Sequence, residues 1–534
     1  MTVQAAAHPP RAVLGGWTAS QTLAIVAILT CAAVMRLITL VSTNEWDGDD
    51  AATGIMARYI EHGHFFVFIA NSSYMGALEQ YLQAGVLFVL PTNGTTLRLV
   101  QVVLAVAVCF SVAVAGRQIT GSAWGGILAA SIFAVGPYFN IAKGIHSHGA
   151  YDTAQLVGVA AIVLAISLDP RHRRARWVSA ALGLCLGLAV WESYLALFLV
   201  IPALAWAIGT SRKSLSRLAL PAIIGTLIGA APLLGYRIAH HSLLQLSVDA
   251  NATFPDISVT QRLDGLLSPV LGMFLGVGKI GAQSGGEYVS QALVPWIPPP
   301  LIVMAALALF GAGAWSRRRG LVDLVTARTR NREPIDIVFA GFLVFVLPYG
   351  YSGFTWLEYD PRYLFTLYPL LAIALAYGIC RMPGRVSIAL GIGLTSGLLI
   401  LSVVALRSDS YMNGVGTTPV TEQTAVEIAN TLGHLHVRSL YANYYLSTPV
   451  NFVSQGRIAG ADPSGAGRFP DQAAAVRGDP NRAYATPTGP NAERLASAIR
   501  DSGATAKRID VDGFAVFYHV SPARLPSDLS YYGD

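Results

Sequence analysis

Charged residues are scarce in this chain. Asp, Glu, Lys and Arg make up 12% of its 534 residues, whereas soluble domains carry about 25%. Hydrophobic residues make up 53%, and the mean hydropathy is +0.51. This composition excludes an ordinary soluble enzyme and predicts a protein that crosses a membrane several times. The net charge of +6 is then loop charge that sets orientation, and it does not indicate nucleic-acid binding.

Cysteines and cofactor motifs are also scarce. The four cysteines, Cys31, Cys109, Cys185 and Cys380, all lie in apolar stretches, which predicts small core residues rather than disulfides. The sequence has no CxxC or His/Cys metal spacing, and no GxGxxG or Walker motif. Zinc-finger, dinucleotide and nucleotide-hydrolysing chemistry are therefore not indicated, and no Ser/His/Asp arrangement stands out.

Long apolar runs are abundant instead. A helix needs about 20 apolar residues to cross a bilayer, and about eleven candidate spans occur. They are residues 17–41, 97–116, 123–139, 152–168, 178–190, 194–209, 218–236, 299–315, 335–350, 362–380 and 386–406. The first run is too long for a cleaved signal peptide, so it is expected to remain as a span.

Basic residues favour alternate loops. With the N-terminus inside, the cytoplasmic loops hold Arg117; Arg171, Arg173, Arg174 and Arg176; Arg212, Lys213 and Arg217; Arg317, Arg318, Arg319, Arg328, Arg330 and Arg332; and Arg381 and Arg385. This bias holds only if residues 178–209 form two short helices with a break near Trp191–Tyr194. Glu192 at that break is expected to be a solvated turn residue, and Arg36 in the first span is expected to extend outward.

An acidic stretch follows the first span. Its acids are Glu45, Asp47, Asp49 and Asp50. A helical stripe comes next, formed by Ala52, Ile55, Met56, Tyr59 and Ile60 and followed by Gly63. We predict a helix lying flat on the membrane, with carboxylates at its N-terminal end facing a cavity. The alternative is that Asp49 or Asp50 only caps the helix.

Other polar side chains are predicted on the same outer face. The candidates for substrate contact are Tyr74, Glu79, Lys143, His146, His148, Asp152, Tyr359 and Arg362. A carboxylate can deprotonate a hydroxyl acceptor and an arginine can hold a phosphate, so these residue types beside a membrane suit a lipid-borne anionic substrate. The histidines carry less weight, because isolated interfacial histidines are more often structural groups.

The composition changes after about residue 407. Charge, glycine and proline rise, and no further span appears. Helices are predicted at Thr421–Leu432 and Asn491–Asp501, short strands at Ser439–Ala442 and Val450–Val453, and a hairpin at Lys507–Val511 with Ala515–Val520, whereas 456–490 reads as loop. We predict a transmembrane domain over 1–406 and a small extracytoplasmic α/β domain over 407–534.

Several pieces of sequence resemble the GT-C superfamily of polyprenyl-phosphate-sugar-dependent glycosyltransferases. The likeness is nearest to the branch of protein O-mannosyltransferases and lipid A aminoarabinose transferases. The pieces are Asp49-Asp50-Ala51 with Met56-Ala57-Arg58 and Gly63; Tyr74–Tyr81; Gly187–Trp191; Arg362–Pro369; and, in the outer domain, Tyr441–Leu446 with Phe452–Gly456. Their order and topology are more specific together than any one piece.

The resemblance implies a fold and a role for the acids. It implies a polytopic α-helical membrane protein with about eleven transmembrane helices, juxtamembrane helices and a small α/β domain outside. Asp49 takes the position of the catalytic carboxylate, and Asp50 replaces the Glu that the family usually has. The family's phosphate-binding Lys is absent where Gly76-Ala77-Leu78 stands, so Arg362 or Lys143 would supply the positive charge.

The resemblance also implies partners. The donor would be a sugar on a polyprenyl phosphate, the acceptor a hydroxyl of a glycan, lipid or protein, and the transfer inverting. The site would face outward from a bacterial plasma membrane. Mg²⁺ or Mn²⁺ at Asp49 and Asp50 is left open.

Two other classes compete with this reading. A transporter or lipid flippase would share the topology, but transporters place ionisable residues at mid-membrane in repeated halves, and no repeat is visible here. A sensor or scaffold with a binding outer domain would not need a carboxylate pair on a membrane-lying helix.

Overall fold

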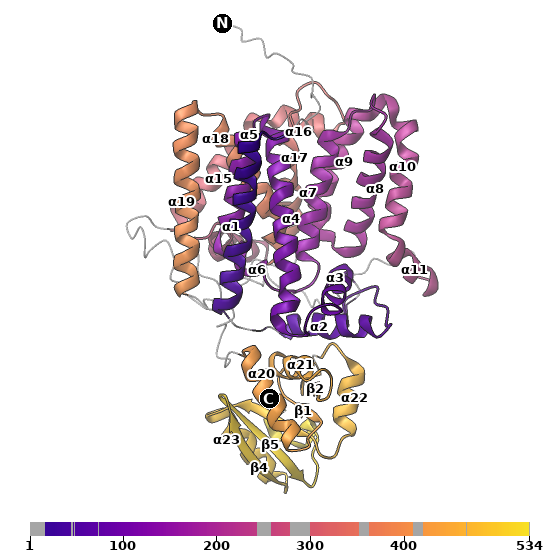
Figure 1. Cartoon of the computed structure of the whole chain (residues 1–534), viewed down its shortest axis with the longest axis vertical. Coiled ribbons are helices and arrows are strands. Elements are labelled where there is room, and N and C mark those ends of the chain that lie inside the picture. The colour runs from indigo at the N-terminus through magenta and orange to yellow at the C-terminus, as the bar shows by residue number, and fades with distance from the viewer. Residues whose placement is uncertain are drawn as a thin grey trace.

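A computed structural model describes residues 16–43, 46, 48–72, 74–242, 258–277, 299–351, 362–408, 420–465 and 467–532. Tyr359, Glu45 and Asp47 lie outside these residues. The chain forms a bundle of long helices with a smaller unit, which contains a β-sheet, below one end of the bundle (Figure 1).

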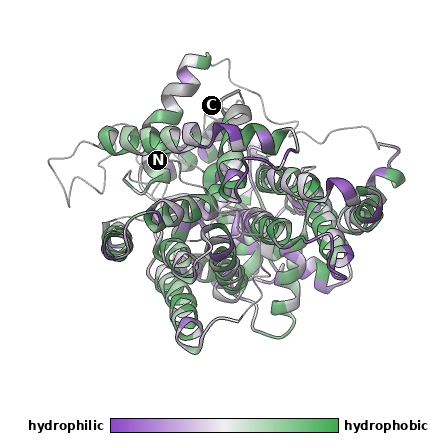
Figure 2. Cartoon of the chain, turned by 90° about the horizontal axis from the view of Figure 1, so that it is seen from above, coloured by the Kyte–Doolittle hydropathy of each residue, from purple (hydrophilic) through white to green (hydrophobic). Residues whose placement is uncertain are grey.

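The bundle helices run along one common direction (Figure 1), and apolar residues dominate them when they are seen end-on (Figure 2). They are α1 Ala19–Thr43, α4 Gly94–Thr120, α5 Ala123–Val135, α7 Tyr151–Ser167, α8 Ala175–Glu192, α9 Leu197–Ser211, α10 Leu215–Gly229, α15 Pro299–Ser316, α17 Ile335–Tyr351, α18 Tyr368–Cys380 and α19 Gly384–Ser408. Two shorter helices, α11 Ala231–Ala239 and α16 Arg318–Val325, extend from it.

Length and composition mark this bundle as membrane-spanning. Among the described helices six are long and apolar enough to cross, or seven if the bent pair Leu301–Ser316 and Arg318–Val325 counts as one span. Three apolar helices are shorter, at Ala123–Val135, Tyr151–Ser167 and Ile335–Val346. The protein is therefore an integral membrane protein, and the figure of about eleven spans stays a prediction.

The predicted break between two short helices is confirmed. Helix α8 ends at Glu192, and Ser193 is extended with φ −162° and ψ 124° before the next helical turn begins. Helices α8 and α10 pack backbone to backbone, because a methyl group at Gly183 would collide with the carbonyl of Ala222. Such close approach through small residues is typical of helices in membranes.

Short helices gather at the end of the bundle that faces the sheet unit. Helix α2, Gly48–Glu61, lies across this end, near α3 Leu78–Leu87 and α6 Tyr138–Lys143 (Figure 1). The sequence prediction of an amphipathic helix is confirmed in its extent, and Gly63 follows with φ +86°. Acids at the N-terminal end of α2 are thereby placed between the bundle and the sheet unit.

The smaller unit is a five-stranded mixed sheet with helices on both faces. Its strand order is β2-β1-β3-β5-β4. The strands are β1 Ser439–Tyr441, β2 Ala459–Ala461, β3 Ala483–Pro487, β4 Thr505–Val511 and β5 Phe514–Ser521, and the helices are α20 Glu422–His434, α21 Tyr444–Val453, α22 Pro470–Gly478 and α23 Pro490–Asp501. Strand β1 is parallel to β2 and β3, whereas β5 is antiparallel to β3 and β4.

Two predictions for this unit were wrong. Residues Val450–Val453 belong to helix α21, not to a strand, since a short apolar run suits a buried helix as well as a strand. The supposed loop 456–490 contains β2, α22 and β3. Strand β2 is built from the small residues Ala459-Gly460-Ala461, which lack the β-branched side chains that mark a strand in sequence.

The sheet unit and helix α2 share one apolar core. Trp46 packs edge-on against Phe452 of α21, with ring centroids 5.2 Å apart. Ala51 and Ile55 of α2 belong to the same buried cluster as Leu440 of β1. The unit is therefore docked on α2 by buried side chains.

Candidate active site at the end of the bundle

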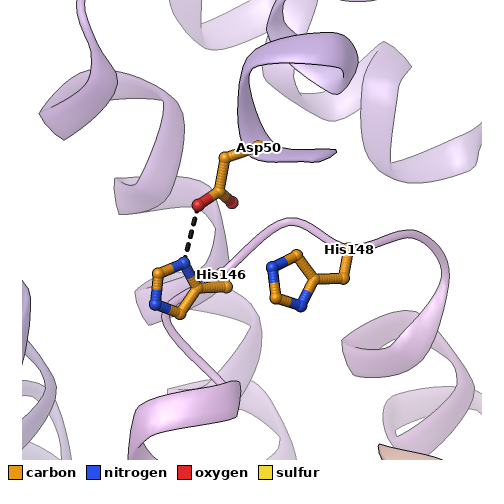
Figure 3. Close-up of side chains that lie close together, drawn as sticks. All are labelled: Asp50, His146 and His148. Atoms are coloured by element: carbon orange, nitrogen blue, oxygen red, sulfur yellow. Dashed lines mark hydrogen bonds and ion pairs between the residues drawn. The ribbon is translucent and has the colours of Figure 1, made fainter. Parts of the chain in front are cut away.

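Asp50 points from α2 into the bundle. Its side chain is 0% exposed, and Oδ2 accepts a hydrogen bond from Nδ1 of His146 at 2.6 Å (Figure 3). The backbone N–H of Ser147 donates to Oδ1, and Nε of Arg98 lies 3.5 Å from Oδ2. Asp50 thus anchors the segment after α6 to the start of α2.

The charges of this pair follow from its surroundings. Burial raises the pKa of Asp50, but His146, which is charged at the acidic pH where Asp50 would titrate, and Arg98 outweigh burial and leave that pKa below its ordinary value. Burial lowers the pKa of His146 to about 4 although Asp50 opposes it. At neutral pH the pair is therefore a carboxylate that accepts Nδ1–H from a neutral imidazole.

Asp49 points the other way, to the sheet unit. Its Oδ1 accepts hydrogen bonds from the hydroxyl of Tyr444 at 2.8 Å and from Nη2 of Arg468 at 2.6 Å. Nε of Arg468 also donates to the Tyr444 hydroxyl at 2.9 Å. The Asp49 side chain remains 21% exposed, so this carboxylate, unlike Asp50, can be reached from the surface.

Arg468 and Tyr444 were missed as site residues in the sequence. Tyr444 lies within the run Tyr441–Leu446 that resembles the family's soluble-domain motif, which was a usable signal. Arg468 is a single basic residue in a Gly-rich stretch that reads as loop, and nothing local marks it.

Two further carboxylates are buried side by side. Glu79, 0% exposed, accepts hydrogen bonds from Gln101 at 3.0 Å and from the backbone and hydroxyl of Thr153 at 3.1 Å. The same hydroxyl lies 2.9 Å from Oε1 of Glu192, and the N–H of Leu78 donates to Oε2. Burial raises the pKa of Glu79 to about 7, although these hydrogen bonds oppose the rise.

Glu192 is buried, contrary to the prediction from sequence. It is 1% exposed, and the expectation of a solvated turn residue was wrong. The segment before α3 covers it: the N–H of Gly76 donates to its carbonyl at 3.0 Å. Tyr74, partly buried, stands in that covering segment.

Buried cations lie near these acids. Lys143 is 1% exposed; its Nζ contacts Nδ1 of His148 and lies 5.0 Å from the ring centroid of Tyr151. Arg36 is also 1% exposed, so the expectation that it extends outward was wrong. Its guanidinium stacks 5.6 Å from the Phe133 ring centroid and donates to the carbonyl of Ala32, which holds it inside the bundle.

The remaining candidates flank this cluster. Asp152 is 1% exposed and lies in the first turn of α7, directly before Thr153. Arg362 is partly exposed and begins the turn Arg362–Leu367, which is fixed to α7 by a hydrogen bond from Gln155 to the carbonyl of Phe365 at 2.6 Å. Tyr359 lies outside the described residues.

In the described part of the chain, Asp50, His146 and His148 lie close enough together to be considered as ligands of one metal ion. One ligand atom of each lies within 4.8 Å of the others, and the two rings are stacked with centroids 5.2 Å apart (Figure 3). Asp49 is not in this group. Arg98 already lies against Asp50, and Lys143 against His148. A divalent ion would have to displace Lys143 and tolerate Arg98, so the donor set fits poorly.

Comparison with known proteins gives a family match and a fold match. No curated protein matches the chain. Residues 77–236 match the family model described as dolichyl-phosphate-mannose-protein mannosyltransferase. The chain is similar to the structure of ArnT from Cupriavidus metallidurans bound to undecaprenyl phosphate, with TM-score 0.61, 12% identity, 95% of this chain and 99% of that chain covered.

The apo structure of the same ArnT gives TM-score 0.51 and 14% identity, over 94% of this chain and 98% of that chain. At such identities the likeness shows the fold. The family match covers the segment that carries Glu79, Lys143, His146 and Glu192. The chain therefore shares its fold with this membrane protein along nearly its whole length, and its residues 77–236 resemble the mannosyltransferase family.

Proposed function

We propose that the protein transfers a sugar from a polyprenyl phosphate to a hydroxyl acceptor, with inversion at the anomeric carbon. One observation carries the proposal: a partly exposed carboxylate, Asp49, lies at the end of a membrane bundle, next in the chain to Asp50, which belongs to a buried polar cluster. The similar ArnT structure is described as bound to undecaprenyl phosphate, which supports a lipid-borne donor.

Asp49 is the proposed base. It removes the proton of the acceptor hydroxyl as the oxygen attacks the anomeric carbon, and the bond between that carbon and the phosphate oxygen breaks on the opposite side. The proton remains on Asp49, and the polyprenyl phosphate leaves with both electrons of the broken bond. Lys143 ends α6, shortly before α7, and Arg362 begins the turn that is hydrogen-bonded to α7. Both are proposed to hold this phosphate.

Asp50 is proposed to act through its neighbours. It is 0% exposed and binds His146 and the backbone of Ser147. It therefore fixes the segment that follows Lys143, without touching the acceptor. Glu79, Asp152, His148 and Tyr74 are proposed to line the donor side of the same site.

The orientation is also a proposal. Helix α16, which carries Arg318 and Arg319, lies at the end of the bundle opposite α2 (Figure 1). Basic loops favour the cytoplasm, so α2 and the sheet unit are proposed to lie outside a bacterial plasma membrane. We retain 1–406 as the transmembrane domain, with about eleven crossings, and 407–534 as the outer domain.

The test measures polyprenyl phosphate released from synthetic prenyl-phosphate sugars by the purified chain in nanodiscs, with envelope extract as the acceptor source. Asp49→Asn is expected to lower the rate by about 10²-fold or more, the usual contribution of a general base. The matched control is Asp501→Asn on the exposed end of α23. Turnover of Asp49→Asn at the rate of the control would remove the base assignment.

A further inference from the structure

The sheet unit contains a cavity of about 260 Å³ at the carboxyl ends of its parallel strands. Asn443 follows β1, Asp462 follows β2, and Pro487 ends β3. The chain goes outward from β1 to β2 and then crosses back past β1 to β3, as the order β2-β1-β3 requires. In open sheets, ligands bind at the carboxyl edge where the winding direction reverses.

The lining of this cavity favours a neutral, hydroxyl-rich ligand. This lining includes Asn443, Asp462, Asn491, Phe514 and Tyr531. Asp462 is the one charged member, and it is negative, so an anionic ligand is disfavoured. Amide and carboxylate side chains can bond neighbouring hydroxyls, and the rings of Phe514 and Tyr531 offer an apolar wall.

The size of the cavity limits the ligand further. Its volume lies below the range of about 300–1,000 Å³ that suits drug-sized ligands. One sugar ring is therefore a better fit than an oligosaccharide. The rest of a longer glycan would have to extend out of the cavity.

The cavity wall is joined to Asp49 by one residue. Asp462 accepts a hydrogen bond from the backbone N–H of Tyr444 at 2.6 Å, and the hydroxyl of Tyr444 donates to Asp49 at 2.8 Å. The loop that begins with Asp462 also carries Arg468, which binds Asp49. A ligand in the cavity is thus held by the same loop and helix that hold the reactive carboxylate.

We propose that this cavity binds one ring of a neutral glycan acceptor and so presents the next hydroxyl of that glycan to Asp49. That the bound glycan is the acceptor rests on the proposed function, whereas the binding of a neutral sugar does not. The acceptor would then be a glycan rather than a lipid or protein, and the C-terminal unit would take part in substrate binding.

The test is saturation-transfer NMR on the full chain in nanodiscs. The probes are the methyl glycosides of glucose, galactose, mannose and N-acetylglucosamine, with glucose 6-phosphate as the anionic comparison. The double variant Asn443→Ala with Asn491→Ala should lower the signal of the best neutral probe about fivefold or more, because two hydrogen-bonding amides are lost. Asn430→Ala, on the exposed side of α20, is the matched control and should leave it unchanged.

A second variant guards against misfolding. Asn491→Asp keeps the side-chain shape but places a second carboxylate beside Asp462. The neutral probes should then bind more weakly, and protonated glucosamine more strongly. An unchanged signal in both variants, or a stronger signal from glucose 6-phosphate than from every neutral probe, would overturn the proposal.

The two proposals fail separately, because this readout needs no turnover. If Asp49→Asn keeps full transfer while the glycoside signal still depends on Asn443 and Asn491, the binding site stands and the base assignment falls. If the variants of these asparagines neither bind less nor raise the KM for a glycan acceptor, the cavity proposal falls and the transfer chemistry is untouched.

Discussion

Asp49 and Asp50 are neighbours in sequence, yet they have different partners. Successive residues of a helix point about 100° apart, so one carboxylate enters the bundle and the other meets the sheet unit. The sequence shows an acidic pair that could cap a helix, bind a metal or act as a base. Only the positions of His146 and Arg468, distant in the chain, separate the two roles.

The surroundings of Asp50 predict that turnover does not depend on a divalent metal ion. Because Arg98 and Lys143 already bring positive charge to Asp50 and His148, we expect donor turnover to stay within about twofold after dialysis against EDTA. Addition of Mn²⁺ to the dialysed protein serves as the control. Loss of turnover on dialysis with recovery on Mn²⁺ would show instead that Asp50, His146 and His148 hold an ion.

Glu79 gives a pH dependence. Its pKa rises from an ordinary 4.5 to about 7 in the folded chain, so the folded state retains a proton that the unfolded state loses between these values. Folded stability should therefore fall as pH rises from 4.5 to about 7, by at most on the order of 3 kcal/mol.

Glu79→Gln mimics the protonated acid and should make this fall smaller than in the wild type. The measurement is the thermal unfolding midpoint from pH 4.5 to 8 in nanodiscs, with Glu427→Gln on the surface of α20 as the control. Equal slopes in wild type and Glu79→Gln would mean that Glu79 is ionised when folded.

At the scale of elements, the contact between α2 and α21 decides how the sheet unit is placed. A methyl group at Gly54 of α2 would collide with the ring of Phe452, which is 0% exposed. Gly54→Ala should therefore destabilise the docked unit by about 1–3 kcal/mol, as overpacking does. Limited proteolysis and the unfolding midpoint measure this effect.

Gly433→Ala is the matched control for this change. Gly433 lies in α20 with nothing within 4 Å of its added methyl group, so the substitution should be neutral or stabilising by about 0.5–1 kcal/mol. Equal midpoints in Gly54→Ala and Gly433→Ala would show that α2 and α21 are not in contact.

Patterns of hydrophobicity predicted elements well where one face is apolar over many residues. The long spans, α2, α20, α23 and the β4–β5 hairpin all follow from such patterns. Helix α21 failed because Val450 and Phe452 are buried on nearly every side, which removes the periodic signal. Strand β2 was missed because its alanines and glycine pack closely, with Gly460 against the backbone of Ser447, and sequence alone does not show such packing.

At the scale of the whole molecule, the orientation is open to a direct test. In the proposed orientation, the basic loops place the other end of the bundle in the cytoplasm, so a phosphatase fused after Asp534 should be active and a green fluorescent protein there dark. Fusions after Arg174 should give the reverse result. A dark phosphatase after Asp534 would invert the proposed topology.

The site was only partly visible from sequence for a related reason. Acids, histidines and Lys143 on polar segments were found by residue type, since ionisable groups at a membrane edge are expensive to keep. The sequence did not predict which residues are buried: Glu192 and Arg36 were expected to be solvated, but both are covered by segments distant in the chain. The contact of Arg468 with Asp49 could be recognised only from the fold, because the two residues lie 419 positions apart.

That separation has a consequence for exchange between relatives. Tyr444 and Arg468 reach Asp49 from the far end of the polypeptide, so the proposed catalytic centre needs residues of the sheet unit as well as of helix α2. A chimera that keeps this bundle but borrows another protein's soluble portion should insert normally and yet be inert, unless the donor portion brings its own phenol and guanidinium to that spot. Natural recombination at the junction should accordingly be rare.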